Sequence, residues 1–109
     1  MKSNSIAIRR LNDRFRQTLS GGRVMITQGV IALGTPALQR TLEKVAAYDA
    51  FDPENDPYGE HDFGAIEVVG RRIFFKIDTY DLTLTAHSEN PADPAVTTRV
   101  LTVMLAEEY

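Results

Sequence analysis

The chain has 109 residues, of which 43% are hydrophobic and 25% are charged, and its formal net charge is −3. This length and composition predict one ordinary globular domain, residues 1–109, and exclude a disordered or fibrous chain. The lack of cysteine excludes disulfides, Cys-ligated zinc and a thiol nucleophile, and the lack of a long apolar run predicts a cytoplasmic protein that does not enter a membrane.

The first predicted element is an amphipathic helix in residues 5–22, which ends at Gly21 and Gly22 because glycine readily adopts a positive φ. Its apolar residues recur at spacings of three and four and therefore share one stripe. Arginines flank this stripe. We favour an exposed face whose arginine stems cover the core edge over a contact with nucleic acid or an acidic partner, because the rest of the chain is acidic and repels phosphate. The stripe consists of Ile8, Leu11, Phe15 and Leu19, and the basic face of Arg9, Arg10, Arg14 and Arg16.

A strand and a second helix are predicted next. Residues 23–34 are β-branched and apolar, which indicates a strand with a bend or bulge at Gly29. Thr35 then suits the N-cap of a helix, and Pro36 suits its first position, where a missing N–H costs nothing. We expect this helix to end at residues 48–50.

Three strands are predicted after residue 62. Residues 63–69 and 73–80 are rich in β-branched and aromatic residues, and the Gly70-Arg71 pair between them favours a hairpin turn. Alternation in the second of these strands gives one apolar face and one mixed face that is partly in contact with solvent. A third short strand is predicted for residues 81–86.

The C-terminal segment is predicted to form a helix over residues 95–109, with Asp93 as its N-cap and Pro94 at its first position. Its apolar residues cover more than half of the circumference, so the helix needs more than one covering surface. Either the sheet and a second helix bury it, which is favoured in so small a chain, or a second copy does so in a homodimer through this helix. The whole sequence predicts an α+β fold: an antiparallel sheet of three to four strands with about three helices packed on it, in the order α-β-α-β-β-β-α.

Charge is distributed unevenly along the chain. Residues 1–23 hold six basic residues and one acidic residue, whereas residues 49–67 hold seven acidic residues and no Lys or Arg. Five of these carboxylates and His61 lie in residues 51–64, which we call the acidic loop. Such opposite blocks either attract each other across the fold or face different partners.

One interpretation of the acidic loop is a divalent-cation site, because carboxylates with one imidazole suit Mg²⁺, Mn²⁺ or Ca²⁺. The EF-hand spacing fails, since Pro57 stands where that motif needs glycine and Phe63 where it needs a bidentate Glu, and no HExxH motif occurs. A looser set remains, in which the histidine also suits a general base. This set consists of Glu60, His61, Asp62 and Asp78, with Asp81 beside them.

The other interpretation of the acidic loop is turn chemistry. Asp52, Asn55 and Asp56 suit Asx turns over the following backbone, the prolines fix φ, and Gly59 supplies an unusual backbone angle. On this interpretation the acidic loop is a structured connection without a ligand.

Three stretches, IRRLNDRFRQTL, the segment from FDPENDPYGEHDFG to KIDTYD, and NPADPAVTTRVLTVMLAEEY, resemble a family of short bacterial proteins known only as a domain of unknown function. Members of that family share an LNDxFR helix, an NDPxGEHDFG loop and a DPAxTTRVLTxMLAEEY tail. The resemblance implies an accessory role in plasmids and integrative elements, including counter-defence, and it lends no catalytic residue.

The preferred hypothesis is a non-enzymatic binding module that needs no cofactor and meets a basic partner protein through the acidic loop and the hairpin face. The alternative is a hydrolase or nuclease that uses a divalent metal at the set given above. A third, less favoured hypothesis places the arginine helix on nucleic acid. No catalytic residue is identified. The expected binding residues are Asp56, Glu60, His61, Asp62, Asp78 and Asp81.

Overall fold

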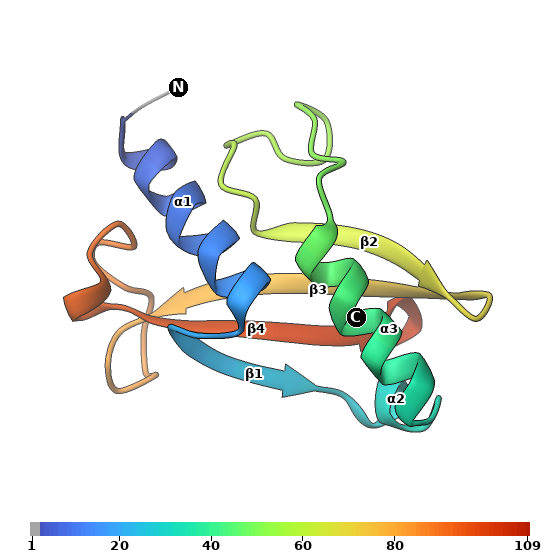
Figure 1. Cartoon of the computed structure of the whole chain (residues 1–109). Coiled ribbons are helices and arrows are strands. Elements are labelled where there is room, and N and C mark those ends of the chain that lie inside the picture. Colours follow the sequence, from blue (N-terminus) through green and yellow to red (C-terminus); the bar gives the residue numbers. More distant parts are fainter. Residues whose placement is uncertain (1–2) are drawn as a thin grey trace.

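The computed structural model describes residues 3–109 as a four-stranded mixed sheet with two helices lying across one of its faces (Figure 1). The strand order is β1-β4-β3-β2. The Cα radius of gyration is 13.8 Å, close to the value of about 13 Å for a compact chain of this length. The α+β class predicted from the sequence is therefore confirmed. The elements are α1 (Ser3–Thr18), β1 (Gly22–Ile26), α2 (Gln28–Ile31), α3 (Thr35–Ala47), β2 (Phe63–Val68), β3 (Arg71–Tyr80), η1 (Pro94–Val96), β4 (Thr98–Leu105) and η2 (Ala106–Glu108).

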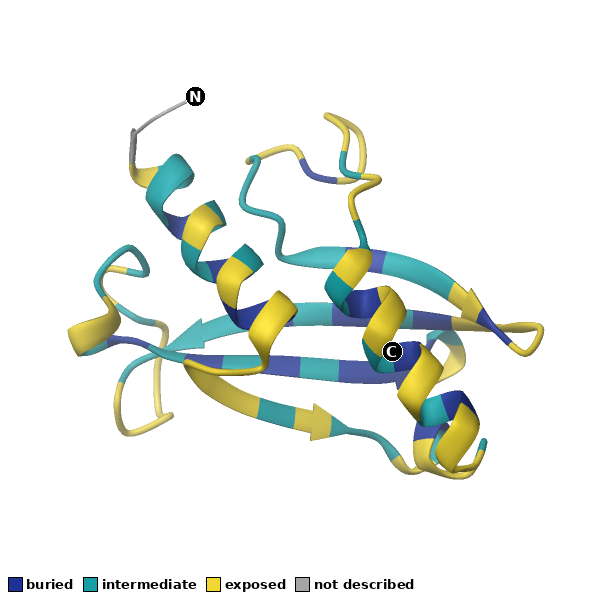
Figure 2. Ribbon diagram, viewed as in Figure 1, coloured by how far each residue is buried: buried dark blue, intermediate teal, exposed yellow. Residues whose placement is uncertain are grey.

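The core lies between the sheet and the helices α1 and α3. Alternate residues of β3 and β4 are buried on the helix-covered face, as the dark segments of Figure 2 show. The sides of α1 and α3 that face the sheet are buried as well, because both helices have an apolar stripe. The core includes Phe15, Val30, Val45, Ile73, Phe75, Leu101 and Val103. Leu19, expected on the apolar stripe, follows the end of α1 with a positive φ of 58° and is exposed.

The predicted hairpin is confirmed, and its turn lies one residue earlier than expected. β2 and β3 pair antiparallel from Phe63 opposite Lys76 to Val68 opposite Arg71. The two residues between them, Val69 and Gly70, have φ of 47° and 75°. Two successive positive φ values give the turn a twist that matches the strands of a tight hairpin.

The predicted C-terminal helix is wrong, because residues 98–105 form β4 in the centre of the sheet. This strand pairs antiparallel with β3 and parallel with β1, so the sheet is mixed, not wholly antiparallel. A central strand meets neighbours on both edges, and this one is also apolar on its second face at Val100 and Met104. The wide apolar arc that suggested a two-sided helix is thus the pattern of a central strand. The helix that would have formed a homodimer does not exist.

Smaller differences concern single turns. Residues 81–86 form a turn and not a third strand, and only one isolated bridge joins Tyr80 to His87. Gln28–Ile31 leave the predicted strand and form the short helix α2. The N-cap of α3 is Gly34 and not Thr35, and α3 ends at Ala47. Asp93 does accept a hydrogen bond as an N-cap, from the Ala95 N–H, but it opens only the single turn η1.

Candidate functional site

Two polar residues of α1, Asn12 and Arg16, are buried where the helix meets α3 and the acidic loop. Arg16 is 2% exposed, and its Nη1 lies 2.7, 3.1 and 3.0 Å from the carbonyl oxygens of Val45, Ala46 and Tyr48. Carbonyls at the C-terminal end of a helix lack intrahelical donors, so the arginine acts as a side-chain cap for α3. Arg16 is therefore not part of an exposed basic face, which leaves Arg10 and Arg14 exposed and Arg9 half-buried.

His61 is held between two carboxylates. Its Nδ1 lies 2.8 Å from Asp13 Oδ1, and its Nε2 lies 3.7 Å from Asp56 Oδ2. The ring also stacks on Phe51, with 3.9 Å between centroids. Because each ring nitrogen faces a protein carboxylate, neither is directed at a position where a metal or a substrate proton would sit. The contact of His61 with Asp13 attaches the acidic loop to α1. With both ring nitrogens facing carboxylates, His61 is not placed to act as a general base.

A second polar chain joins the same loop to the sheet. The Asn12 Nδ2 donates to the Glu60 carbonyl at 2.9 Å, and the Arg99 Nε donates to Asn12 Oδ1 at 2.8 Å. Arg99 is 3% exposed and also donates to the Pro91 carbonyl. The three stretches that carry the family resemblance thus meet in one buried polar layer.

Asp52, Asp78 and Asp81 are engaged in local structure. The carboxylate of Asp52 accepts from the N–H groups of Glu54 and Asn55 at 2.8 and 2.9 Å, which is an Asx turn. Asp81 accepts from the Thr85 N–H and the Thr83 hydroxyl, both at 3.0 Å, and these bonds lower its pKa. Asp78 pairs with Lys76 at 2.8 Å, and this hydrogen bond raises the lysine pKa.

Asp56 is also engaged, because it is 8% exposed and its two carboxylate oxygens each lie 3.3 Å from the backbone N of His61. The predicted turn chemistry therefore accounts for Asp52, Asn55 and Asp56. Asp81, expected among the binding residues, accepts hydrogen bonds only within its own turn, so it is not brought together with the others.

Glu60 and Asp62 are half-buried carboxylates that form no ion pair within residues 3–109, and neither side chain caps a turn as those of Asp81 and Asp93 do. Burial raises the pKa of Glu60, the nearby charges of Asp62 and Asp56 raise it further, and the charge of Arg99 opposes the rise. Burial likewise raises the pKa of Asp62, opposed by a bond to its own backbone N–H and reinforced by Asp56 and Asp78. The open end of the hairpin, where β2 begins, thus holds carboxylates that repel one another, and we call this end the mouth of the hairpin.

No group of three or more His, Asp or Glu side chains in the described part of the chain is placed to hold a metal ion. The proposed metal set is accordingly not assembled, since His61 faces Asp13 and Asp56, and Asp78 faces Lys76.

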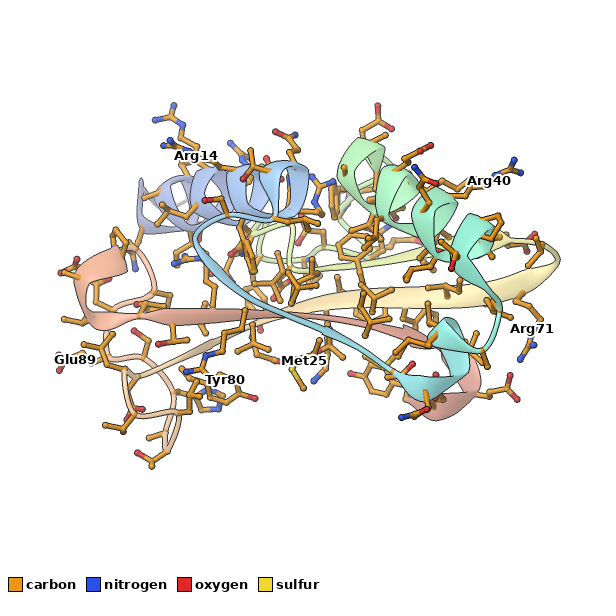
Figure 3. All side chains as sticks on the ribbon, turned by 60° about the horizontal axis from the view of Figure 1, so that its bottom comes forward. Arg14, Met25, Arg40, Arg71, Tyr80 and Glu89 are labelled. Carbon is orange, nitrogen blue, oxygen red and sulfur yellow. The ribbon has the colours of Figure 1, made fainter. Side chains whose placement is uncertain are left out.

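The face of the sheet opposite the helices is open. Met25 and Tyr80 project from it in Figure 3, and Met25 is 57% exposed. Three rings gather there: Phe63 and Phe74 are tilted to each other with 5.1 Å between centroids, and Tyr109 meets them edge to face at 6.0 and 5.8 Å. We call these three rings the aromatic patch. Strand alternation places Lys76 and Asp78 on the same face as the patch.

The residues that sequence reasoning missed are Asn12, Asp13 and Arg99. The sequence does indicate that Asn12 is buried, because it lies four residues after Ile8 and three before Phe15, on the apolar stripe itself. A polar side chain on such a stripe is buried and needs hydrogen-bond partners. Arg99 gave no such signal while its strand was taken for a helix.

The fold and the site define a small α+β domain in which a buried polar layer anchors an acidic loop over one edge of the sheet. This chain belongs to the family described as "Protein of unknown function (DUF3768)", which matches residues 26–108. No curated protein and no solved structure matches the chain. All of α1, including Asn12 and Arg16, lies before the matched residues. No helix in residues 3–109 is long and apolar enough to cross a membrane.

Proposed function

We propose that this protein is a non-enzymatic binding module that contacts a basic segment of a partner protein through Glu60, Asp62 and the adjoining aromatic patch. The observation that carries the proposal is that these two half-buried carboxylates form no ion pair among residues 3–109 and keep raised pKa values despite the charges of Arg99 and His61, although the loop that presents them is firmly anchored. Such a module acts through its partner, in keeping with an accessory role.

The electrostatics of the hairpin mouth support a cationic ligand. Burial is the main cause of the raised pKa of Glu60 and Asp62, and the neighbouring carboxylates, Asp56 among them, raise it further, so holding these charges together costs free energy. An arginine or lysine of a partner would relieve this repulsion. Raised pKa values of this kind occur more often at functional positions than elsewhere.

The open face of the sheet supports a protein as the source of that cation. Asp78 lies on this face and is close enough to Asp62 to raise its pKa, so the carboxylates and the face adjoin. The aromatic patch is partly exposed, and Tyr109 is 72% exposed. Aromatic side chains surrounded by charged groups are typical of protein interfaces, where large rings contribute much of the binding energy.

The metal-dependent hydrolase or nuclease has no comparable support. Its ligands would be Glu60, His61, Asp62 and Asp78, two of which already have protein partners in the described residues. We therefore do not carry it forward as a second proposal.

The test is calorimetric titration of the whole chain with a synthetic peptide rich in Arg and Lys that also carries one aromatic residue. We expect saturable binding that Glu60→Gln with Asp62→Asn weakens by about tenfold or more, because two charge-assisted contacts are lost. The matched control is Asp49→Asn with Glu54→Gln, since both residues are exposed carboxylates of the same acidic segment and the change in net charge is the same.

Equal weakening by both double variants would mean that only net charge matters, and the assigned surface would be wrong. Binding that survives Glu60→Gln with Asp62→Asn would contradict the proposal outright.

A further inference from the structure

A hollow of about 290 Å³ lies between the end of α1, the turn before β1, and the segment from η1 to β4. A chain of hydrogen bonds links this hollow to the acidic loop: Arg99, which lines the hollow, donates to Asn12, and Asn12 donates to the Glu60 carbonyl. The volume of the hollow is near the lower end of the range for small-molecule sites. The polar side chains that line it are those of Arg14, Ser20, Thr97 and Arg99.

Arg99 is a buried cation without a carboxylate partner in residues 3–109. Its Nε and Nη2 donate to a side-chain amide oxygen and a backbone carbonyl, both neutral acceptors. No ion pair is formed; burial lowers the pKa of Arg99, and the charge of Glu60 opposes this shift. A buried charge is costly unless an opposite charge and hydrogen bonds match it.

The remaining nitrogen of Arg99 is available to a ligand. Nη1 of Arg99 makes no hydrogen bond within the described residues. Among the side-chain nitrogens and oxygens of those residues, Arg16 Nε is the only one that is both shielded from solvent and without a hydrogen bond. Arg99 Nη1 therefore keeps contact with solvent, and Arg99 lines the hollow. Arg16 differs, because its carboxylate partner Asp13 lies 3.0 Å away.

A second cation stands at the rim of the hollow. Arg14 lines it, is exposed, and makes no ion pair in the described chain. Its side chain lies on the outer side of α1 in Figure 3. Exposed side chains change rotamer within nanoseconds, so Arg14 can turn to close on a ligand that Arg99 holds.

We propose that this hollow binds the phosphoryl group of a small molecule, with Arg99 at its base and Arg14 closing over it. Guanidinium groups offer paired donors that match phosphate oxygens, and two cations balance the charge of a phosphate, about −1.5 to −2 at pH 7. A carboxylate carries one negative charge and fewer acceptor sites, so it would satisfy this donor set less well. The hollow shares no lining residue with the surface proposed for the partner protein, although the charge of Glu60 acts on Arg99.

The test is a titration of the whole chain with inorganic phosphate at constant ionic strength, followed by the NMR signal of the Arg99 Nε–H. We expect this signal to shift saturably, and Arg14→Gln to weaken the binding by about tenfold, the scale of one charged hydrogen bond. The matched control is Arg10→Gln, because Arg10 is an exposed arginine of the same helix that does not line the hollow. It should bind phosphate as the unchanged protein does.

Three results would overturn the proposal. One is no shift of the Arg99 signal up to about 20 mM phosphate. Another is equal weakening by Arg10→Gln and Arg14→Gln, which would mean non-specific attraction to α1. The third is equal binding of acetate, which would remove the phosphoryl group as the ligand. Because Arg14→Gln alters only an exposed side chain, the test does not depend on whether a variant of the buried Arg99 folds.

Discussion

Arg16 shows how one residue can hold two elements and a loop together. Its guanidinium reaches three carbonyls at the end of α3 and the carboxylate of Asp13, and it also lies over the rings of Phe51 and Phe75 at 5.4 and 5.7 Å. Positive charge at a helix C-terminus is favourable because the helix dipole is negative there. Arg16 therefore stabilises the fold, and its guanidinium group is not available to a partner protein.

We predict that Arg16→Met lowers the free energy of unfolding by about 3 kcal/mol or more, because it leaves carbonyls and a carboxylate without their donor. The methionine keeps an apolar stem of similar length, so the loss would come from the guanidinium. Urea denaturation measures the difference. Arg10→Met is the control, since Arg10 is exposed on the same helix, and it should change stability by less than about 0.5 kcal/mol. Similar losses in the two variants would contradict this role.

The two carboxylates of the proposed binding surface should lower stability in the free protein. Because burial and repulsion raise the pKa of Glu60 and Asp62, the folded state holds protons at pH values where the unfolded chain has released them. Their contribution to the free energy of unfolding therefore falls as pH rises from the unfolded pKa to the raised folded pKa, and the penalty is complete above it.

We predict that Glu60→Gln with Asp62→Asn stabilises the free protein at pH 7 by roughly 0.5 kcal/mol, the scale of partly exposed charge interactions. The gain should shrink toward zero as the pH is lowered to about 3, where the native carboxyl groups are protonated in both states. Denaturation curves at several pH values measure it. A variant less stable than the native protein at pH 7 would show that these carboxylates serve the fold.

At the scale of elements, the acidic loop and the hairpin are positioned by close packing on Gly64 in β2. A Cβ at this position would collide with the ring of Phe75 and come within 2.9 Å of Tyr48 Cε1. The rings of Tyr48, Phe51 and Phe75 contact one another edge to face. Glycine here lets α3, the loop and β3 approach each other.

We predict that Gly64→Ala costs about 1–3 kcal/mol of stability, because the rings must leave their rotamers or the strand must move. Ala65→Ser, at the next position on the open face, is the control and should change stability by less than about 0.5 kcal/mol. Thermal or urea unfolding compares them. A Gly64→Ala variant with unchanged stability would contradict close packing around this strand.

Elements with local signals could be predicted from the sequence, and the central strand could not. The 3.6-residue period of α1 and α3 and the alternation of the hairpin depend on neighbours in the sequence. β4 is apolar on both faces, and its parallel partner β1 lies more than seventy residues earlier in the chain. A real helix-start signal at Asp93 and Pro94 then favoured the wrong extension, because it serves only the turn η1.

The same division between local and distant partners applies to the site. Composition located the acidic loop, and turn chemistry correctly assigned Asp52 and Asp56 to the backbone of the loop. The buried layer depends on partners that are 29 residues apart for Arg16 with Val45 and 87 residues apart for Arg99 with Asn12. Only the three-dimensional structure brings those atoms together and shows that Glu60 and Asp62 are half-buried without an ion pair in the described residues.

At the scale of the whole molecule, the sheet separates two surfaces. The helix side carries exposed arginines such as Arg14 and Arg40, and Met25 and Tyr80 project from the opposite, open face (Figure 3). The open face also holds the aromatic patch, where Arg72 lies 5.4 Å from the centre of the Phe74 ring, and Asp78 adjoins Asp62. This second surface is the one proposed to meet a basic partner.

An NMR titration of the ¹⁵N-labelled chain with the basic aromatic peptide tests this claim most directly. We expect saturable shifts at Glu60, Asp62 and Phe63, extending to Asp78 and Tyr109, with the arginines of α1 unaffected. Shifts that gather on α1, or no shift at all at low salt, would contradict it.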